Sequence, residues 1–128
     1  MRSPVLALVI AAVVGCAPRA ARPPPPVRAG TPEEALRAFT DALREERFAA
    51  AQSLLSARWR TAYTPERLAV DLRGAGPAGR EAAQRVASAL AEGAPLERNG
   101  VTARLPLGGD RAASVVREQD GWKVDALE

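Results

Sequence analysis

Within residues 31–128 of this chain of 128 residues, the spacing of apolar residues changes from helical to alternating at Gly93. Before that glycine, apolar residues recur three or four positions apart, which is the period of an amphipathic helix. After it they recur at every second position, which is the period of a half-buried strand, as in Val101, Ala103, Leu105 and Leu107. A run of helices followed by a run of strands predicts an α+β domain.

The first helix is predicted to begin at Thr31. This threonine can cap the helix, Pro32 fits its first position, and Glu34 completes a capping box. An apolar face follows at helical spacing, formed by Ala35, Leu36, Phe39, Ala42 and Leu43. The phase then changes near residues 46–48, and a second apolar set follows, formed by Phe48, Ala51, Leu54 and Leu55. The change predicts a bend or a second short helix that ends near Ser56.

Two further helices are predicted before the strands. A second threonine followed by proline, at Thr64, begins a helix that Gly74 is predicted to end. Residues 74–77 are predicted to form a loop because they contain two glycines and a proline. The next helix is predicted over residues 80–92, with Gly93 as its C-cap.

Four short strands are predicted in the remaining chain. The turns that separate them are Asn99-Gly100, Gly108-Gly109-Asp110 and Asp120-Gly121. The strands would cover residues 95–98, 101–107, 111–118 and 122–127. Together with the helices, they predict a curved antiparallel four-stranded sheet on which the N-terminal helices pack.

The register of the last hairpin has two alternatives. A two-residue turn at Asp120-Gly121 places Val115 on the face of Trp122. A three-residue turn that holds Gly121 in a bulge places Val116 on that face instead. A slip of one residue exchanges the two faces of a strand, and the sequence leaves both alternatives open.

Residues 1–15 have the features of an export signal. Arg2 supplies a positive charge, and residues 4–14 form an uncharged apolar run that is shorter than the roughly 20 residues of a membrane-spanning helix. The run ends in Val13, Val14, Gly15 and Cys16. This segment resembles the lipobox of bacterial lipoprotein signal peptides, in which an aliphatic residue, a small or aliphatic residue and Gly or Ala precede the cysteine.

The resemblance implies that a signal peptidase removes residues 1–15. Cys16 would carry a diacylglycerol thioether and an acylated amino group, because two or more acyl chains hold a protein stably in a membrane. The alternative is a small buried cysteine after an ordinary N-terminal anchor or leader. Cys16 is the only cysteine, which excludes a disulfide within the chain and any site built from several cysteines.

Residues 16–30 are predicted to be a tether between the lipidated cysteine and a domain at residues 31–128. Four consecutive prolines, residues 23–26, favour an extended polyproline II conformation that could reach roughly 40 Å. A passive spacer explains this composition. The alternatives are a ligand of an SH3-like domain, or a segment attracted to anionic surfaces through Arg19, Arg22 and Arg28.

Residues 31–127 resemble the NTF2-like superfamily, in particular the small DUF4878-type lipoprotein domains. Three segments carry the resemblance: Pro32-Glu33-Glu34-Ala35 with Phe39, then Phe48, Ala51, Leu54, Leu55 and Ser56, and finally Val115 to Val124 around Asp120-Gly121 and Trp122-Lys123-Val124. The resemblance implies a long helix across a cone-shaped sheet whose open end often forms a pocket. Some members are ketosteroid isomerases or dehydratases, and many others bind ligands or assemble without catalysis. This chain has no histidine, so the histidine-based acid–base pairs of those enzymes are absent.

Three of the few aromatic residues are candidates for an apolar pocket: Trp59, Tyr63 and Trp122. Ordinary core or rim packing is the alternative, especially for Trp122 at the start of a strand. A weaker hypothesis pairs Tyr63 with Asp71 as the donor and base of an isomerase site. No cofactor is predicted, because the chain lacks a phosphate-binding glycine loop and a cluster of metal ligands.

The charges exclude a nucleic-acid-binding stripe as an interpretation. The net charge is +3, and basic residues are interspersed with acidic ones throughout the domain. The sequence therefore predicts a non-enzymatic envelope lipoprotein that is held at a membrane through Cys16. Its domain would bind a small apolar ligand or an envelope protein, or would form a homodimer as a structural module. The resemblance to lipoproteins implies that, in an envelope with two membranes, an aspartate after the lipidated cysteine retains the protein in the inner membrane. Ala17 occupies that position here, which favours the periplasmic face of the outer membrane. In an organism with one membrane, the same anchor would leave the domain outside the cell.

Overall fold

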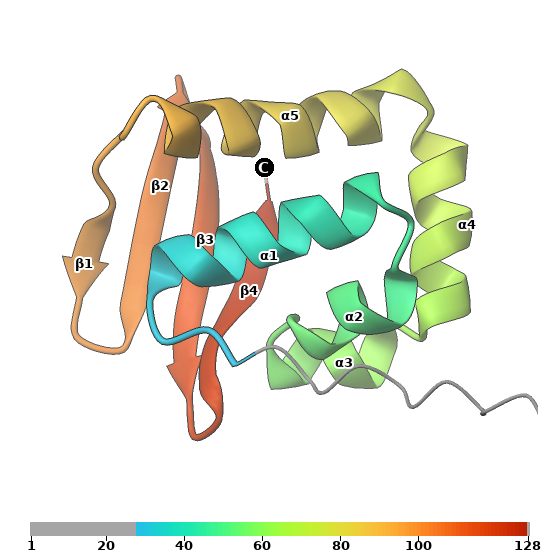
Figure 1. Cartoon of the computed structure of the whole chain (residues 1–128), viewed down its shortest axis with the longest axis horizontal. Helices are drawn as coiled ribbons and strands as arrows, with labels where there is room; N and C mark the ends of the chain where they lie inside the picture. The colour runs from blue at the N-terminus through green and yellow to red at the C-terminus, as the bar shows by residue number, and fades with distance from the viewer. Residues whose placement is uncertain (1–27, 128) are drawn as a thin grey trace, which may run out of the picture.

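The computed structural model describes residues 28–127, so the lipobox and the tether as far as residue 27 lie outside the described residues. Within these residues five helices precede four strands (Figure 1). The helices are α1 (Pro32–Arg44), α2 (Phe48–Ser53), α3 (Ala57–Ala62), α4 (Pro65–Ala75) and α5 (Pro77–Ala91). The strands are β1 (Glu97–Asn99), β2 (Thr102–Gly108), β3 (Arg111–Glu118) and β4 (Gly121–Leu127). The predicted α+β class is confirmed.

α1 begins at the predicted cap. Thr31 Oγ1 accepts a hydrogen bond from the backbone N–H of Glu34, and Pro32 occupies the first turn. The Glu34 carboxylate accepts from the N–H of Gly30 at 2.8 Å, one residue before the position that a capping box predicts. The predicted apolar face is buried, and Leu36 is fully enclosed.

A tight reversal at Glu46 ends α1. The N–H of Arg47 donates to the carbonyl of Ala42 at 2.8 Å, and the N–H of Glu46 donates to that of Leu43 at 3.2 Å. This is the Schellman arrangement, which allows α2 to begin two residues later. The predicted second short helix is confirmed, although it ends at Ser53 rather than near Ser56.

α3 was not predicted from the sequence. None of its residues is buried, so it lacks the periodic apolar face that marks a helix in a sequence. Its side chains are instead held by polar contacts to distant strands, which are described below.

The predicted loop at residues 74–77 is wrong. α4 continues through Gly74 to Ala75, and α5 begins at Pro77, three residues before the predicted start. A single glycine costs a helix only about 1 kcal/mol, so Gly74 does not stop α4. Pro77 fits the first turn of a new helix, and Gly76, with φ of 57°, makes the whole connection.

The predicted antiparallel meander is confirmed, with the strands in the order β1-β2-β3-β4. Its first turn is shifted by one residue, because Asn99 pairs with Thr102 and the turn is Gly100-Val101. Gly100, with φ of 60°, occupies the first turn position, as type II′ hairpins require. Val101 therefore leaves the predicted buried face and is 60% exposed.

The last turn is Gln119-Asp120 rather than Asp120-Gly121, because Glu118 pairs with Gly121. Gly121 lies against the chain that enters the domain, since a Cβ added to it would stand 2.6 Å from the carbonyl oxygen of Ala29. The next residue fixes this contact, because the N–H of Trp122 donates to the same oxygen at 3.0 Å. A glycine is therefore required at position 121 because two backbones approach closely there, and not because of the turn itself.

The structure has neither of the two predicted registers, because Glu118 pairs with Gly121, but it shows which face Val115 occupies. Val115 pairs with Val124, and both side chains are 1% exposed on the helix-covered face. Val116 pairs with Lys123 on the opposite face. The predicted face of Val115, shared with Trp122, is confirmed, but the turn that was to place it there is wrong. Asp125 is an extra residue that forms a bulge beyond the Val115–Val124 pair.

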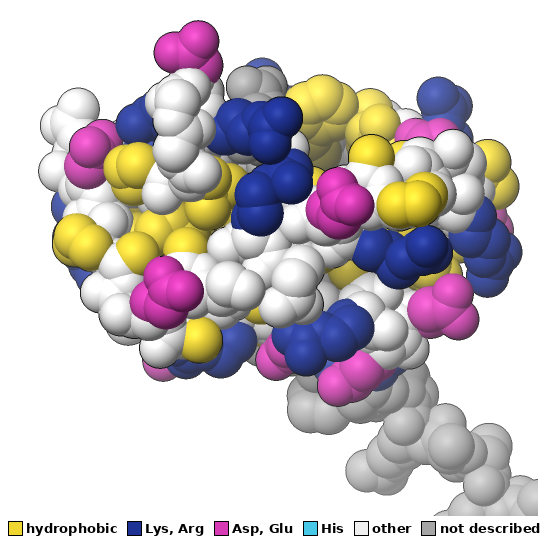
Figure 2. Space-filling view, turned by 90° about the horizontal axis from the view of Figure 1, so that it is seen from above, with side chains coloured by type: hydrophobic (Ala, Val, Ile, Leu, Met, Phe, Trp, Pro, Cys, Tyr) yellow, Lys and Arg dark blue, Asp and Glu magenta, His cyan; other side chains and the backbone are white. Residues whose placement is uncertain are grey.

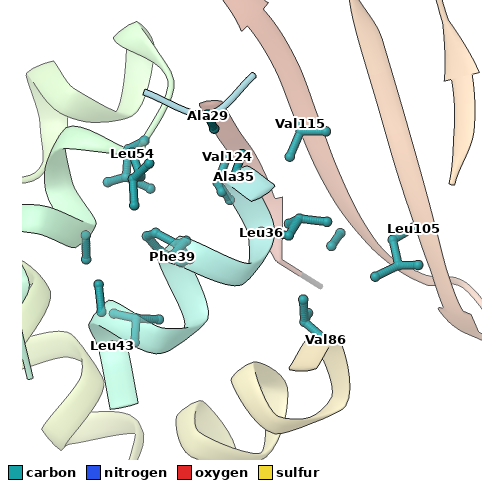
Figure 3. Packing of buried hydrophobic residues seen from close by; sticks show 14 of the residues in the cluster. Ala29, Ala35, Leu36, Phe39, Leu43, Leu54, Val86, Leu105, Val115 and Val124 are labelled. Atoms are coloured by element: carbon teal, nitrogen blue, oxygen red, sulfur yellow. The ribbon is translucent and has the colours of Figure 1, made fainter. Parts of the chain in front are cut away.

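The core lies between the sheet and the helices (Figure 3). Leu36 of α1, Val86 of α5 and Leu105 of β2 gather on one side of α1, and Phe39 lies toward Leu54 on the other. The segment after α2 lines the edge of β4, because the N–H of Val124 donates to the carbonyl of Leu54 at 2.7 Å. Among residues 28–127, no helix is long and apolar enough to cross a membrane.

Candidate functional site

An apolar pocket of about 240 Å³ lies where α1, α3, α4 and β4 meet. Its lining residues are Phe39, Leu55, Trp59, Tyr63, Leu68, Val124, Asp125, Ala126 and Leu127. The structure therefore brings two of the three predicted pocket residues, Trp59 and Tyr63, to one cavity. Trp122 lines a different groove, beside Ala29 and the last hairpin.

The indole of Trp59 is fixed at the pocket wall. Its Nε1–H donates to the backbone carbonyl of Asp125. Its ring lies 5.7 Å from that of Tyr63, centroid to centroid, at an interplanar angle of 51°. The guanidinium of Arg58 lies 5.1 Å from the Trp59 ring centroid, within the range of a cation–π contact. These contacts hold two aromatic rings in a set orientation beside the cavity.

Asp125 anchors α3 to β4 through its carboxylate. Oδ1 accepts from Ser56 Oγ and from Arg58 Nε, each at 2.7 Å, and Oδ2 accepts from Arg58 Nη2 at 2.8 Å. Burial raises the pKa of the Asp125 carboxyl, but the hydrogen bonds from Arg58 and Ser56 outweigh burial and bring the pKa below its ordinary value of 3.8. The carboxylate is therefore a structural anion at neutral pH.

Further polar contacts hold the two ends of α3. Glu118 Oε2 accepts from the N–H of Ala57 at 2.8 Å, and its Oε1 accepts from Arg60 Nη2 at 3.1 Å. At the other end, Gln52 Nε2 donates to the carbonyl of Tyr63 at 3.3 Å. The sequence did not predict the roles of Glu118, Gln52 and Asp125, because no local pattern indicates hydrogen-bond partners that are 11 to 69 positions apart.

Tyr63 and Asp71 are linked through Arg67. The Arg67 guanidinium lies 5.9 Å from the Tyr63 ring centroid, and its Nε lies 3.4 Å from both carboxylate oxygens of Asp71. No hydrogen bond within residues 28–127 joins Tyr63 to Asp71 directly. The arrangement gives no support to the donor–base pair that the isomerase hypothesis requires.

The charges near the pocket balance one another. Arg58 is paired with Asp125, and Arg67 with Asp71, so the guanidinium groups beside the rings of Trp59 and Tyr63 both have a carboxylate partner. A cavity of about 150 Å³ lined by apolar side chains can hold benzene. The pocket here has a volume of about 240 Å³, so it has room for a molecule a few carbon atoms larger than benzene. Its walls and size suit an uncharged ring or a short acyl segment.

Another groove, of about 540 Å³, lies further along the same face of α4, between α1 and α5. Leu72 of α4 lines this groove, whereas Leu68, one turn earlier, lines the apolar pocket. The groove also carries charges of both signs, from Arg44, Glu46, Arg73, Arg80 and Glu81. Figure 2, which looks down on the molecule from above, shows basic and acidic side chains interspersed among hydrophobic ones.

Within the part of the chain that the structure describes, no group of His, Cys, Asp and Glu could hold a metal ion. No protein-family model, curated protein or solved structure matches the chain. The apolar pocket at Trp59 and Tyr63 is therefore the candidate site on its geometry alone.

Proposed function

We propose that this protein is a lipid-anchored envelope protein whose domain binds a small apolar ligand in the pocket at Trp59 and Tyr63, without catalysis. The observation that carries the proposal is the pocket itself. Its walls are apolar, and Trp59 and Tyr63 are held in place by contacts that leave their rings against the cavity. Preformed concave sites with such linings are the usual form of small-molecule sites.

The anchor is supported by the lipobox of Val13, Val14, Gly15 and Cys16. Acyl chains on Cys16 would hold the domain at the periplasmic face of the outer membrane, on the proline-rich tether of residues 16–30. Cys16→Ser should move the protein from the membrane fraction to the soluble fraction and remove the lipid mass from the mature N-terminus. An unchanged membrane fraction would refute the anchor.

An NTF2-like, DUF4878-type architecture is also proposed for the domain. Its support is a first helix that packs against β3 and β4, a meander in which each strand pairs with the next, and a pocket beside the last strand. The cone-shaped sheet of that superfamily would place the open end at Trp59 and Tyr63.

Ligand binding can be measured through Trp59 in a Trp122→Phe background, which leaves one indole. Toluene and 1-octanol serve as an aromatic and an acyl probe. We expect either probe to change the Trp59 emission in a saturable manner. Leu68→Phe, which fills the pocket, should weaken binding at least tenfold, whereas Leu72→Phe one turn away in the groove between α1 and α5 should not. Equal effects of the two substitutions would contradict the proposal.

A structural role as a homodimer is the second candidate. The helices pack on one face of the sheet, and on the opposite face Ser114 and Val116 are only half-buried. A second copy could cover that face. Light scattering would show a dimer that Val116→Glu dissociates, without changing probe binding at Trp59. A monomer at all concentrations would remove this candidate.

A further inference from the structure

We propose that the end of the domain that receives the tether is a docking surface for the anionic headgroups of a lipid bilayer. We name it the tether-entry end, and it consists of Arg28, Val101, Arg117 and Trp122. The proposal rests on the lipid anchor proposed above and concerns a groove at the start of β4, whereas the apolar pocket is lined by β4 from Val124 onward. The first and the last of the three hairpin turns and the entering chain meet at this end, in the lower part of Figure 1.

The tether is fixed to this end by backbone contacts. Ala29 is 2% exposed, and its carbonyl accepts from the N–H of Trp122 at 3.0 Å. The first hairpin lies alongside, because the N–H of Arg117 donates to the carbonyl of Val101 at 2.7 Å. A groove of about 590 Å³ runs between these segments. The membrane that holds Cys16 is therefore joined to the domain at this end, and this end faces the membrane whenever the domain lies close to it.

Val101 supplies an exposed apolar side chain at the turn. Among residues 28–127, the exposed large hydrophobic residues are Val101, at 60%, and Val70 on α4, at 63%. One exposed valine is ordinary on a soluble surface. Val101 differs from Val70 because it stands beside the partly exposed indole of Trp122, and tryptophan favours the headgroup level of a bilayer.

The charges of this end add a positive bias. Two of its acids form ion pairs within the domain, since Glu118 pairs with Arg60 at 3.1 Å and Asp120 with Lys123 at 3.0 Å. A third, Glu34, accepts a hydrogen bond from the backbone N–H of Gly30 at 2.8 Å. Arg28 and Arg117 are exposed, and neither forms an ion pair with any described residue. Guanidinium groups in this position are attracted to anionic headgroups within a Debye length of the surface.

Because the tether holds the domain near the membrane, even a weak contact between the tether-entry end and the lipid headgroups is sufficient for docking. Residues 17–27 separate Cys16 from Arg28, so the domain stays within roughly 40 Å of its anchor even when the tether is fully extended. A site held that close experiences a high effective concentration of lipid surface, and two arginines with one valine can then favour one orientation.

The test uses the full lipidated chain carrying Trp59→Phe, so that Trp122 is the reporting indole. The protein is reconstituted in vesicles of phosphatidylcholine and phosphatidylglycerol that include a lipid with a nitroxide on its headgroup. We expect the nitroxide to quench Trp122, and high salt to reduce the quenching. Val101→Asp and Arg117→Glu should each reduce it at least twofold, and Val70→Asp, at a residue of equal exposure, should leave it unchanged.

Flotation of the same vesicles separates the two levels of the proposal. Protein that floats while Trp122 stays unquenched would overturn the docking and leave the anchor in place. Protein that fails to float would overturn both. Quenching that Val70→Asp reduces as strongly as Val101→Asp would show undirected tumbling near the membrane and would also overturn the docking.

Discussion

Glu46 occupies a backbone conformation that glycine normally holds. Its φ is 55°, in the left-handed region, at the position just beyond the end of α1. The corresponding position after α5 is Gly93, with φ of 73°, and the two reversals share the same pair of backbone hydrogen bonds. The chain thus contains the Schellman motif twice, in a relaxed form with Gly93 and in a strained form with Glu46.

Glu46→Gly should therefore stabilise the protein. Removing the side chain relieves the left-handed strain, partly offset by the greater freedom of glycine in the unfolded chain, and we expect a gain of about 0.5–1 kcal/mol in the free energy of unfolding. Urea denaturation measures the change. The reverse substitution at the matched position, Gly93→Glu, should destabilise by a similar amount, and a loss of stability in Glu46→Gly would contradict the strain argument.

The Asp125 carboxylate predicts acid sensitivity. Its pKa in the folded protein lies below 3.8, because Arg58 and Ser56 outweigh burial, so the contribution is fully present above the unfolded pKa and is lost as pH falls through the folded pKa. Asp125→Asn should cost about 1–3 kcal/mol near neutral pH, and the difference from the wild type should shrink below about pH 4. Denaturation across pH measures it.

Asp71→Asn is the matched control for Asp125. Its partner Arg67 is an exposed neighbour on the same helix at 3.4 Å, so the change should stay within about 0.5 kcal/mol at every pH. An Asp125→Asn variant with the same small and pH-independent effect would show that the carboxylate does not hold α3.

The helices differ in how well they can be predicted from the sequence. α1 was predicted with its start and its buried face, because its cap and its apolar stripe are local patterns. α3 was missed because it buries no residue and depends on Glu118 and Asp125, which follow it by about 60 residues. The same separation in sequence limits the prediction of the candidate site. Trp59 and Tyr63 could be predicted because aromatic residues are rare in this chain, but Asp125, which holds Trp59 in place, could not.

α4 should be the least protected of the longer helices. Ala69 is its one buried residue, whereas α1 buries seven, and Leu68 and Leu72 each border a cavity. Few buried contacts imply a low free energy of local opening. Hydrogen exchange should show the amides of α4 exchanging well before those of α1 under native conditions. Equal protection in the two helices would mean that α4 opens only with the whole domain.

At the scale of the whole molecule, the entering chain and the last hairpin form one unit. Ala29 belongs to the core cluster although it precedes the predicted domain start at Thr31. The sequence could not show this, because an alanine at the end of a proline-rich segment has no pattern of its own. Its burial depends on Gly121, whose missing side chain admits the Ala29 carbonyl from 92 positions away along the chain.

A chain that starts at Arg28 should therefore be more stable than one that starts at Thr31. The shorter chain loses the buried Ala29 side chain, the bond from the Trp122 N–H and the bond from the Gly30 N–H to Glu34, which together cost about 2 kcal/mol. Thermal and urea denaturation of the two chains measure the difference. Gly121→Ala in the longer chain should reproduce most of this loss without shortening it, because the added Cβ would stand 2.6 Å from the Ala29 carbonyl oxygen. If both changes were neutral, the domain would begin at Thr31 and the contact at Gly121 would carry no stability.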